Sequence, residues 1–356
     1  MADRVKAALV GAGGYAAEKV VPFITSFKNV KYVAVCDANL DTARAAAAKI
    51  GAQMVTADIQ DVLARPDIDY VELQVPNFLH APLTHAALEA GKHVLVQKPI
   101  ARTVDEARGM VRAARQAGRQ LGVYMDGYND PWHWDIKAAV KAGLIGRPVG
   151  FRIRYAHQGG LKLTGEAWRK SSAQTGGGCF LLLVVHLTNA IAWFLDTRIT
   201  RVTGFMKTLM ADMEGDDSTA GALELANGLV GSVETSYIAD GSPDIPNTVM
   251  ELRGTEGAIR HQRDDGILYV YSKKNTWRGK GFVYDQPGQT LKYTRDVHDY
   301  MHPTVQERFA AAIRGGEPYI CYGESGLADL AVCLAMEQSS KTGCAVSIDE
   351  FIGEKP

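Results

Sequence analysis

The 356-residue sequence lacks an excess of charge of either sign, because 39 lysines and arginines face 40 aspartates and glutamates. The charged residues are interspersed, with no basic stripe, polybasic patch or acidic tail. This balance argues against a nucleic-acid partner and against binding to a membrane surface. We therefore expect the partner of this protein to be a small molecule.

Paired cysteines are also absent. The five cysteines stand singly in the chain, at Cys36, Cys179, Cys321, Cys333 and Cys344. Their spacing matches neither a zinc motif nor a redox dithiol, so we expect reduced, structural thiols and no metal site. The first residues, "MADRVKAALV", contain no apolar signal-peptide segment, which predicts a cytoplasmic protein.

A long uninterrupted apolar run is missing as well. The nearest approach is "GGGCFLLLVVHLTNAIAWFL" at residues 176–195, which His186, Thr188 and Asn189 interrupt. A membrane-spanning helix needs about twenty mainly apolar residues, so a buried helix within a folded domain is the better prediction. The hydrophobic fraction of 46% is enough for the cores of two domains, the number expected from the length.

Residues 1–127 are predicted to form an α/β domain with a doubly wound parallel sheet, because short β-rich runs alternate with helix-like stretches. We expect strands at residues 7–11, 32–37, 70–75, 93–97 and 121–125, and helices at 40–51 and 103–118, each closed by a glycine.

Residues 128–356 are predicted to form a second, α+β domain with a mostly antiparallel open sheet. A linking helix is expected near residues 132–143, and two helices near 304–316 and 326–343. Alternating segments joined by glycine turns lie at 150–157, 199–206, 219–225, 228–238 and 248–260. There is no internal repeat.

The stretch "AALVGAGGYAAEKV" predicts a dinucleotide-binding turn between a strand and a helix, with Ala16 as the small third member after Gly11 and Gly13. Asp37 ends the next strand, where a carboxylate would accept hydrogen bonds from the adenosine ribose hydroxyls. No arginine follows it to hold a 2'-phosphate, which favours NAD over NADP. The expected cofactor contacts are Gly11, Ala12, Gly13, Gly14, Tyr15, Ala16 and Asp37. A structural glycine turn beside a surface aspartate is the alternative.

Polar residues follow the next two predicted strands. Pro76, Asn77 and His80 come after one strand, and Gln97 and Lys98 come after the other. Ligands of open α/β sheets bind outside the carboxyl ends of the strands, so these residues are expected around the nicotinamide half of the cofactor. Lys98 is the candidate for proton transfer, and a solvated surface lysine is the alternative.

In these motifs the chain resembles the Gfo/Idh/MocA oxidoreductase family, which includes glucose-fructose oxidoreductase and inositol dehydrogenases. The resemblance extends over nearly the whole chain, through "GAGGYA", "VPNFLHAPLTHAALEAGKHVLVQKP", "GLIGRP", "WRKSSAQTGGG", "GTEGAI" and "GLADLAVCLAMEQSSKTG". It implies an N-terminal Rossmann domain, a C-terminal open-sheet domain, a tightly held nicotinamide cofactor and a catalytic lysine at Lys98. It also implies cofactor or substrate contacts at Trp168 and Arg169. The family usually has Glu-Lys-Pro where this chain has Gln97.

The resemblance also bears on the apolar run. On a helix Leu182, His186, Asn189 and Trp193 share one face. The family usually has aspartate, histidine and aspartate at the positions of Leu182, His186 and Asn189, and the histidine transfers a proton to or from substrate. We expect His186 to keep this role without a carboxylate neighbour, beside a more apolar pocket at Leu182. The alternative is that another side chain supplies the carboxylate. Residues 176–178 are expected to let the backbone approach substrate or nicotinamide, unless they form a structural hinge.

Together these features predict an NAD-dependent dehydrogenase that oxidises a secondary hydroxyl of a sugar, glycoside or cyclitol. Lys98, with or without His186, is the expected base, and Tyr155, Gln158 and Asn189 could bind other hydroxyls. The alternatives are a redox-neutral NAD-dependent enzyme that cleaves glycosides and a non-catalytic NAD-binding sensor. A broad apolar face on the open sheet is expected to pair copies into a homodimer or homotetramer.

Overall fold

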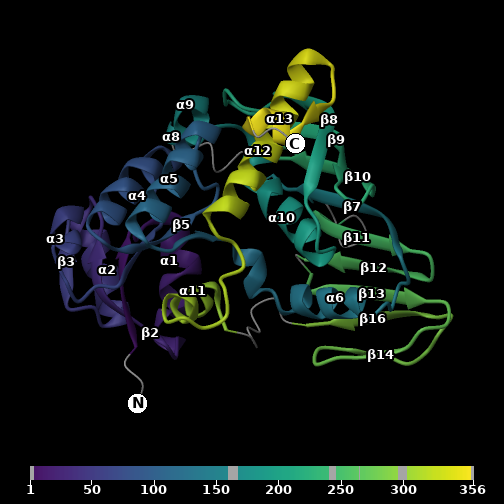
Figure 1. Ribbon diagram of the computed structural model, residues 1–356, viewed down its shortest axis with the longest axis horizontal. Helices are drawn as coiled ribbons and strands as arrows, with labels where there is room; N and C mark the ends of the chain where they lie inside the picture. Colours follow the sequence, from purple (N-terminus) through teal and green to yellow (C-terminus); the bar gives the residue numbers. More distant parts are fainter. Residues whose placement is uncertain (1–3, 159–166, 240–245, 264, 296–302, 354–356) are drawn as a thin grey trace. The chain divides into compact units, whose positions relative to one another are not determined.

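The computed structural model describes residues 4–158, 167–239, 246–263, 265–295 and 303–353. The chain divides into two compact units. Unit 1 comprises residues 1–125 and 303–327, and unit 2 comprises residues 126–302 and 328–356. Figure 1 shows the elements of both units along the chain.

Unit 1 contains a six-stranded parallel sheet in the order β3-β2-β1-β4-β5-β6. The order reverses next to β1, which is the switch point of a doubly wound fold. The strands are β1 (Val5–Val10), β2 (Val30–Cys36), β3 (Met54–Thr56), β4 (Tyr70–Leu73), β5 (His93–Gln97) and β6 (Leu121–Tyr124). The helices are α1 (Gly14–Lys19), η1 (Val21–Ser26), α2 (Leu40–Ile50), α3 (Ile59–Leu63), η2 (Asn77–Leu79), α4 (His80–Glu89), α5 (Val104–Ala117) and α11 (Val305–Ile313).

The predicted doubly wound sheet is confirmed, since all five expected strands are present. The sixth strand, β3, has three residues and was not predicted, because so short a segment has no readable alternation. Helices α2 and α5 end at Gly51 and Gly118, which both adopt the left-handed conformation that glycine favours.

Unit 1 also contains α11, which lies far along the chain. The Glu307 carboxylate accepts a hydrogen bond from the Lys28 backbone amide at 2.9 Å, and Asn29 Nδ2 donates to the Glu307 carbonyl at 2.8 Å. Phe309 packs edge-on against Tyr70, with ring centroids 5.4 Å apart. Our predicted boundary assigned all residues after 127 to the second domain. Residues 303–327 instead pack with unit 1, a long-range contact that local sequence patterns do not encode.

Unit 2 is built on a nine-stranded mixed sheet in the order β16-β13-β12-β11-β7-β10-β9-β8-β17. Its pairs are antiparallel except for β7 and β10, which run parallel. The strands are β7 (Pro148–Ala156), β8 (Ile199–Lys207), β9 (Ser218–Leu225), β10 (Val230–Ser236), β11 (Thr248–Gly254), β12 (Gly257–Gln262), β13 (Ile267–Ser272), β16 (Thr290–Thr294) and β17 (Val346–Ser347). A separate hairpin pairs β14 (Trp277–Arg278) with β15 (Val283–Tyr284). The mostly antiparallel second sheet is thus confirmed.

The helices of unit 2 are η3 (Asp126–Asn129), α6 (Pro131–Lys141), α8 (Ala167–Lys170), α9 (Ser172–Thr175), η4 (Phe180–Val184), α10 (Val185–Phe194) and α13 (Ile348–Ile352). Helix α12 (Gly323–Thr342) begins among the residues of unit 1 and ends among those of unit 2. In Figure 1, α6 and α10 lie over one face of the nine-stranded sheet. That face carries the buried core residues of the strands, such as Ile153, Val233 and Ile259.

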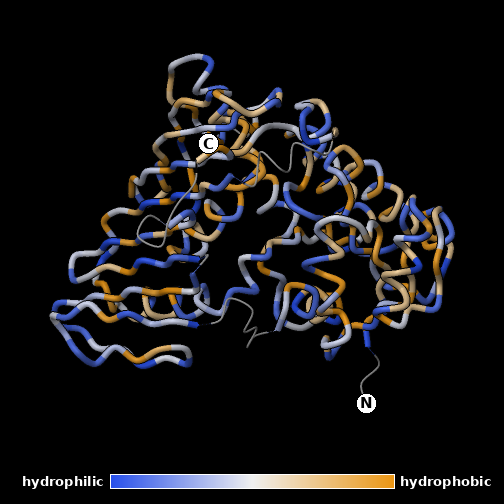
Figure 2. Tube along the Cα trace, turned by 180° about the vertical axis from the view of Figure 1, so that it is seen from behind, coloured by the Kyte–Doolittle hydropathy of each residue, from blue (hydrophilic) through white to orange (hydrophobic). Residues whose placement is uncertain are grey.

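The opposite face of this sheet is mixed in character, and our prediction of a broad apolar face was wrong. Register places Arg152 and Arg154 beside Glu234, and Arg260 beside Tyr269, on this face. The Arg154 and Glu234 side chains approach to 3.7 Å. A large exposed apolar side chain lies toward one edge, at Phe205 on β8. In Figure 2 the strands change repeatedly between hydrophilic and hydrophobic residues, as a sheet with one buried face requires.

The apolar run forms a π-helix, η4, that continues into the α-helix α10. Residues 172–194 are long and apolar enough to cross a membrane by length and composition, but 83% of the relevant window is buried inside the protein. The helix is therefore a core helix of unit 2, as predicted.

Candidate functional site

The glycine turn of unit 1 follows β1 closely. Gly11 has a φ of +86°, and a Cβ there would lie 2.3 Å from the carbonyl oxygen of Gln74 at the end of β4. Only glycine therefore fits this position. A Cβ at Gly13 would meet nothing nearer than a methyl group at 3.9 Å, so the turn is open at that residue.

Asp37 lies at the carboxyl end of β2, beside the glycine turn. One of its carboxylate oxygens accepts a hydrogen bond from the Ala12 amide at 2.8 Å, and the other accepts from the Asn39 amide at 2.9 Å. These bonds fix the carboxylate against the turn. A fixed carboxylate at this place suits the adenosine ribose hydroxyls of NAD.

The segment after β4 is held by a buried histidine. The His80 side chain is fully buried, with Nδ1 2.8 Å from the Pro99 carbonyl and Nε2 2.9 Å from the Val75 carbonyl. Burial lowers the pKa of His80. Both ring nitrogens lie at hydrogen-bond distance from backbone carbonyls, so the residue joins the loops after β4 and β5. The contact with the cofactor that we predicted for His80 stays a prediction.

Gln97 is the last residue of β5 and Lys98 follows it, and both are half-buried. Gln97 Oε1 accepts a hydrogen bond from the Lys98 amide at 2.8 Å, and Gln97 Nε2 donates to Gln74 Oε1 at 2.8 Å. Gln74 in turn donates to the Glu72 carboxylate at 2.7 Å. A series of hydrogen bonds through two side-chain amides therefore joins the backbone of the candidate catalytic lysine to a carboxylate inside the sheet.

Glu72 is fully buried on β4, and burial raises its pKa to about 7 although three hydrogen bonds oppose the shift. The hydroxyl of Tyr32 and the amides of Gln74 and Gln306 donate to its carboxylate. A family carboxylate is missing at position 97. Glu72 is a buried acid linked to that position by two amide side chains, and the sequence pattern did not predict it.

In unit 2 the central pair is Asp126 and His186. Asp126 begins η3, directly after the last residue of unit 1, and His186 lies in the first turn of α10. The carboxylate oxygen Oδ1 and the imidazole Nδ1 lie 2.9 Å apart, with 23% and 8% of the two side chains exposed. A carboxylate at this distance stabilises a protonated imidazole.

The expectation that His186 lacks a carboxylate neighbour was therefore wrong. The missing carboxylate comes from Asp126, sixty residues earlier in the chain, and not from the helix. Arg263, which follows β12, donates from Nη2 to the other Asp126 oxygen at 3.1 Å. Leu182 is buried, with 5% of its surface exposed, and the more apolar pocket expected beside it stays a prediction.

Asn189 has a structural partner on each side. Its side-chain oxygen accepts from the Tyr128 hydroxyl, and its Nδ2 donates to Asp329 Oδ2 at 2.7 Å. Asn189 and Asp329 are each only 7% exposed, and burial raises the pKa of Asp329 to about 8. The Asn189 amide therefore joins η3 to α12. That Asn189 also binds a substrate hydroxyl stays a prediction.

Backbone conformation and close packing explain the glycines before the apolar helix. Gly176 ends α9 with a φ of +87°, and a Cβ at Gly178 would lie 2.2 Å from the Asp216 amide nitrogen. The Asp216 carboxylate accepts from Phe180 N at 3.1 Å and from Thr219 Oγ1 at 2.7 Å. The glycines therefore let the start of the helix pack against the turn at residue 216.

The remaining predicted residues of unit 2 are accessible. Tyr155 is half-buried at the end of β7, with its ring 5.6 Å from that of His157, and Gln158 is exposed. Trp168 and Arg169 are half-buried in α8, with the guanidinium 4.5 Å from the indole centroid. Asn77 in unit 1 is buried. Contacts of these residues with cofactor or substrate stay predictions.

Three site residues were missed by sequence reasoning: Asp126, Arg263 and Glu72. Asp126 directly follows a predicted strand, which is a usable signal. Arg263 has no such signal, since Asp126 lies more than a hundred residues away in the sequence. Glu72 has one near partner, Gln74, but Tyr32 and Gln306 lie at least forty residues away.

Comparisons with known proteins agree with this architecture. Residues 5–125 match the model described as the oxidoreductase family with NAD-binding Rossmann fold, and residues 133–260 match that of the GFO/IDH/MocA C-terminal domain. An uncharacterised oxidoreductase of Rhizobium meliloti, ORF334, is 36% identical over 351 residues, covering 96% of this chain and 98% of the relative.

Several relatives have named activities, of which two follow. A 1,5-anhydro-D-fructose reductase of Ensifer adhaerens is 27% identical, over 96% of this chain and 98% of its own. The NAD-dependent scyllo-inositol 2-dehydrogenase of Bacillus subtilis is 26% identical, over 98% of both chains.

The fold agrees with solved structures. A levoglucosan dehydrogenase in complex with NADH and levoglucosan superimposes with a TM-score of 0.83 at 21% identity, covering 97% of this chain and 100% of the other. The glycine turn, the fixed Asp37 carboxylate and both matched domains lead to one assignment. The chain belongs to the Gfo/Idh/MocA family of oxidoreductases and has that family's NAD-binding Rossmann domain.

Proposed function

We propose that this protein is an NAD-dependent dehydrogenase that oxidises a secondary hydroxyl of a sugar, glycoside or cyclitol. The observation that carries the proposal is Lys98 at the carboxyl end of β5, in the sheet that presents the glycine turn and Asp37. The relatives named for sugar and cyclitol substrates support the substrate class.

In this proposal NAD, when bound, supplies the hydride acceptor. The glycine turn at residues 11–16 holds its pyrophosphate, and Asp37 accepts hydrogen bonds from its adenosine ribose. Pro76, Asn77 and Gln97 border the nicotinamide half. From unit 2, Trp168 and Arg169 contribute further cofactor contacts.

Lys98 acts as the base that takes the hydroxyl proton of the substrate. The amide chain through Gln97 and Gln74 fixes its backbone. His186 assists in proton transfer, because the Asp126 carboxylate stabilises the charge that the imidazole gains. Tyr155 and Gln158 bind other hydroxyl groups of the substrate.

The test follows NADH absorbance with purified protein and NAD across a panel of sugars, glycosides and inositols. We expect net NADH formation with at least one of them. For the best substrate, Lys98→Ala should lose about a hundredfold to ten-thousandfold in turnover, because general acid–base catalysis contributes an effect of this size. NAD affinity should change little.

Near-normal turnover of Lys98→Ala would show that another group is the base. Substrate conversion without net NADH formation would instead indicate redox-neutral chemistry. Bound NAD without conversion of any compound in the panel would favour a sensor. We further propose that the protein works in the cytoplasm, as a homodimer or homotetramer formed through the open face of the nine-stranded sheet.

A further inference from the structure

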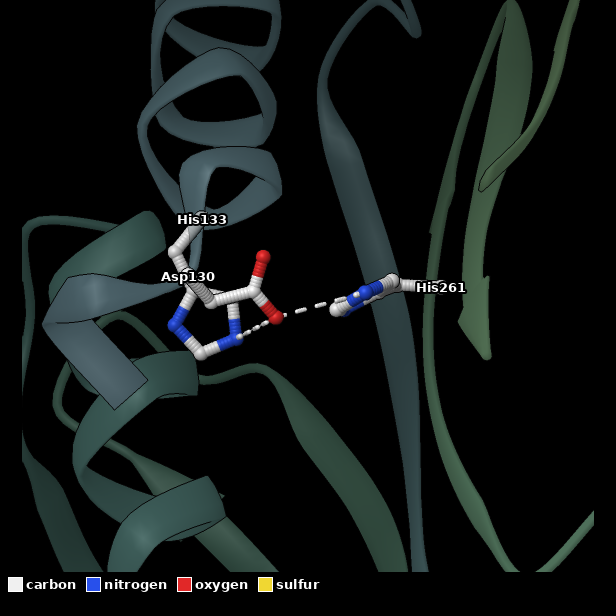
Figure 3. Close-up of side chains that lie close together, drawn as sticks. All are labelled: Asp130, His133 and His261. Carbon is white, nitrogen blue, oxygen red and sulfur yellow. Dashed lines mark ion pairs between the residues drawn. The ribbon is translucent and has the colours of Figure 1, made fainter. Parts of the chain in front are cut away.

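Two histidines and an aspartate converge inside unit 2, outside the pair formed by Asp126 and His186. Asp130 caps the N-terminus of α6, His133 lies in the first turn of that helix, and His261 lies on β12 (Figure 3). Each residue offers one ligand atom, and these atoms all lie within 4.8 Å of one another. Both imidazoles are 1% exposed.

The local sequence explains why these groups point at one another. Asp130 Oδ1 accepts the capping hydrogen bond from the Trp132 amide at 2.9 Å, which turns Oδ2 toward the imidazoles. His261 lies on the buried face of β12, two residues after the core residue Ile259. The ring of His133 packs edge-on against His261, with centroids 5.6 Å apart.

The spacing within this cluster does not fit hydrogen bonding. Asp130 Oδ2 lies 3.5 Å from His261 Nε2 and 4.0 Å from His133 Nε2, whereas nitrogen–oxygen hydrogen bonds span about 2.7–3.2 Å. Neither ring nitrogen of His133 forms a hydrogen bond with any residue that the structure describes. A buried imidazole with neither nitrogen bonded is costly unless a further group binds it.

The same spacing fits a small cation. Ligands at about 2.0–2.2 Å in a tetrahedral arrangement lie about 3.4 Å apart. The Asp130 and His261 atoms are 3.5 Å apart, and the whole set, within 4.8 Å, needs only small side-chain rotations to reach this spacing. Two imidazoles and one carboxylate form a donor set suited to Zn²⁺ and similar transition metals, whereas Mg²⁺ and Ca²⁺ prefer oxygen ligands. We propose that Asp130, His133 and His261 form a binding site for a divalent cation of the Zn²⁺ class.

The charge of the surroundings agrees with such a site. Arg263 is the nearby cation, and its charge is offset by its hydrogen bond to Asp126. The aspartate leaves the cluster with the net negative charge that favours a cation.

A metal here would join two elements of unit 2. Asp130 and His133 belong to the start of α6, and His261 belongs to β12. Asp130 also directly follows η3, the short helix that begins with Asp126. The cation would therefore fix η3 and stabilise the position of Asp126, without itself taking part in the redox reaction.

The test uses the full-length untagged protein. Metal content is measured by mass spectrometry after purification without chelator, and EDTA-treated protein is titrated with Zn²⁺ and with Co²⁺. We expect about one Zn²⁺ per chain, visible Co²⁺ absorption bands at a stoichiometry of about one, and a Tm that rises with Zn²⁺ concentration.

Two variants locate the metal. Asp130→Asn keeps the cap on α6 but loses the charged ligand, and His261→Gln removes one imidazole. Each should weaken Co²⁺ binding by more than about 100-fold. Even the loss of a residue that only hydrogen-bonds to a metal ligand lowers metal affinity by about 10–100-fold. The control variant His85→Gln, on α4, should bind Co²⁺ as tightly as the unaltered protein does. Far-ultraviolet circular dichroism verifies folding, and either folded variant decides the question.

The proposal is overturned if the unaltered protein takes up neither Zn²⁺ nor Co²⁺ at micromolar concentrations. It is equally overturned if a folded variant binds the metal as tightly as the unaltered protein. Neither outcome depends on dehydrogenase activity.

Discussion

Asp126 and Asp130 lie four residues apart around η3, and each faces the buried imidazole of a histidine from another element. The first carboxylate contacts His186 of α10 and the second lies near His261 of β12. Arg263, two residues after His261, donates to Asp126 and completes a charged network inside unit 2. Single side chains at the ends of elements thus determine the electrostatics of the candidate site.

The pair formed by Asp126 and His186 gives a direct prediction. Asp126→Asn keeps the shape of the side chain but removes the charge that stabilises a protonated imidazole. We expect turnover on the best substrate to fall by about tenfold to a hundredfold, less than the loss for the principal base. Steady-state kinetics provide the measurement, and NAD affinity should not change.

Asp212→Asn is the matched control, because Asp212 is exposed and, among the contacts described, pairs only with Lys170. It should leave turnover as it is. Full activity in Asp126→Asn would show that His186 does not need the carboxylate.

Asp37 should determine the choice of cofactor. Its carboxylate is fixed by two backbone amides and would repel a 2'-phosphate while accepting bonds from free ribose hydroxyls. Calorimetry should show tighter binding of NAD than of NADP, and Asp37→Ala should reduce the difference. A clear NADP preference in the unaltered protein contradicts this prediction.

Glu72 should make stability depend on pH. Its pKa is raised from 4.5 to about 7 in the folded protein, so it holds a proton there that the unfolded chain has lost. The stability that comes from this proton is fully present below pH 4.5 and is lost as the pH rises to about 7. By linkage, the shift corresponds to a loss of about 3 kcal/mol in the free energy of unfolding.

Glu72→Gln removes the titrating group and keeps an amide oxygen for the donors around it. Urea unfolding between pH 4.5 and 7.5 should show a flatter profile for this variant than for the unaltered protein. Glu89→Gln, at an exposed helix end, should keep the original slope. Identical slopes for Glu72→Gln and the unaltered protein would rule out a neutral buried Glu72.

Among the elements, the helix of residues 180–194 carries most of the contacts that define the site in unit 2. It begins with a π-turn and becomes α-helical at Val185, and π-turns often occur at functional sites. His186 contacts Asp126, Asn189 contacts Tyr128, and Trp193 packs against the Tyr128 ring at 5.1 Å. One face of the helix therefore binds η3 over its whole length.

The start of this helix depends on Gly178. A Cβ there would meet backbone atoms of Asp216 at 2.2–2.3 Å, and backbone cannot move aside as a flexible side chain can. Gly178→Ala should lower the free energy of unfolding by at least about 1–3 kcal/mol, the usual cost of overpacking. Urea unfolding measures this.

Gly109→Ala is the matched control. Gly109 lies inside α5, where a Cβ would have ordinary contacts at 3.6 Å, and alanine has the better helix propensity. It should be neutral or stabilising. Equal stability of Gly178→Ala and the unaltered protein would contradict the close packing at residue 216.

For the whole molecule, the open face of the nine-stranded sheet supports the expected oligomer, although it is charged as well as apolar. Light scattering at micromolar concentration should give a multiple of the 38.6 kDa chain mass. Ala258→Arg would place a large cation among Arg253, Arg260 and Tyr271 on this face and should shift the mass toward the monomer. Ala117→Arg, exposed at the end of α5, should not. A monomer mass for the unaltered protein contradicts the prediction.

The sequence by itself determined the parts of this protein that depend on neighbours along the chain. Strand and helix periodicity, the glycine turn after β1, Asp37 at the end of β2 and Lys98 at the end of β5 are all local patterns. They were enough for the doubly wound NAD-binding domain, the mostly antiparallel second sheet and the family. These features are readable because a parallel sheet always brings the carboxyl ends of its strands to one edge.

Only the tertiary structure decided which distant side chains meet. Asp126 reaches His186 across sixty residues, His261 approaches Asp130 across more than a hundred, and α11 returns to unit 1 from the end of the chain. It also showed that His80 lies against the backbone carbonyls of Val75 and Pro99 and that Asn189 joins Tyr128 to Asp329. No local pattern encodes such contacts, because they depend on how buried faces pack, and packing joins residues without regard to their separation in sequence.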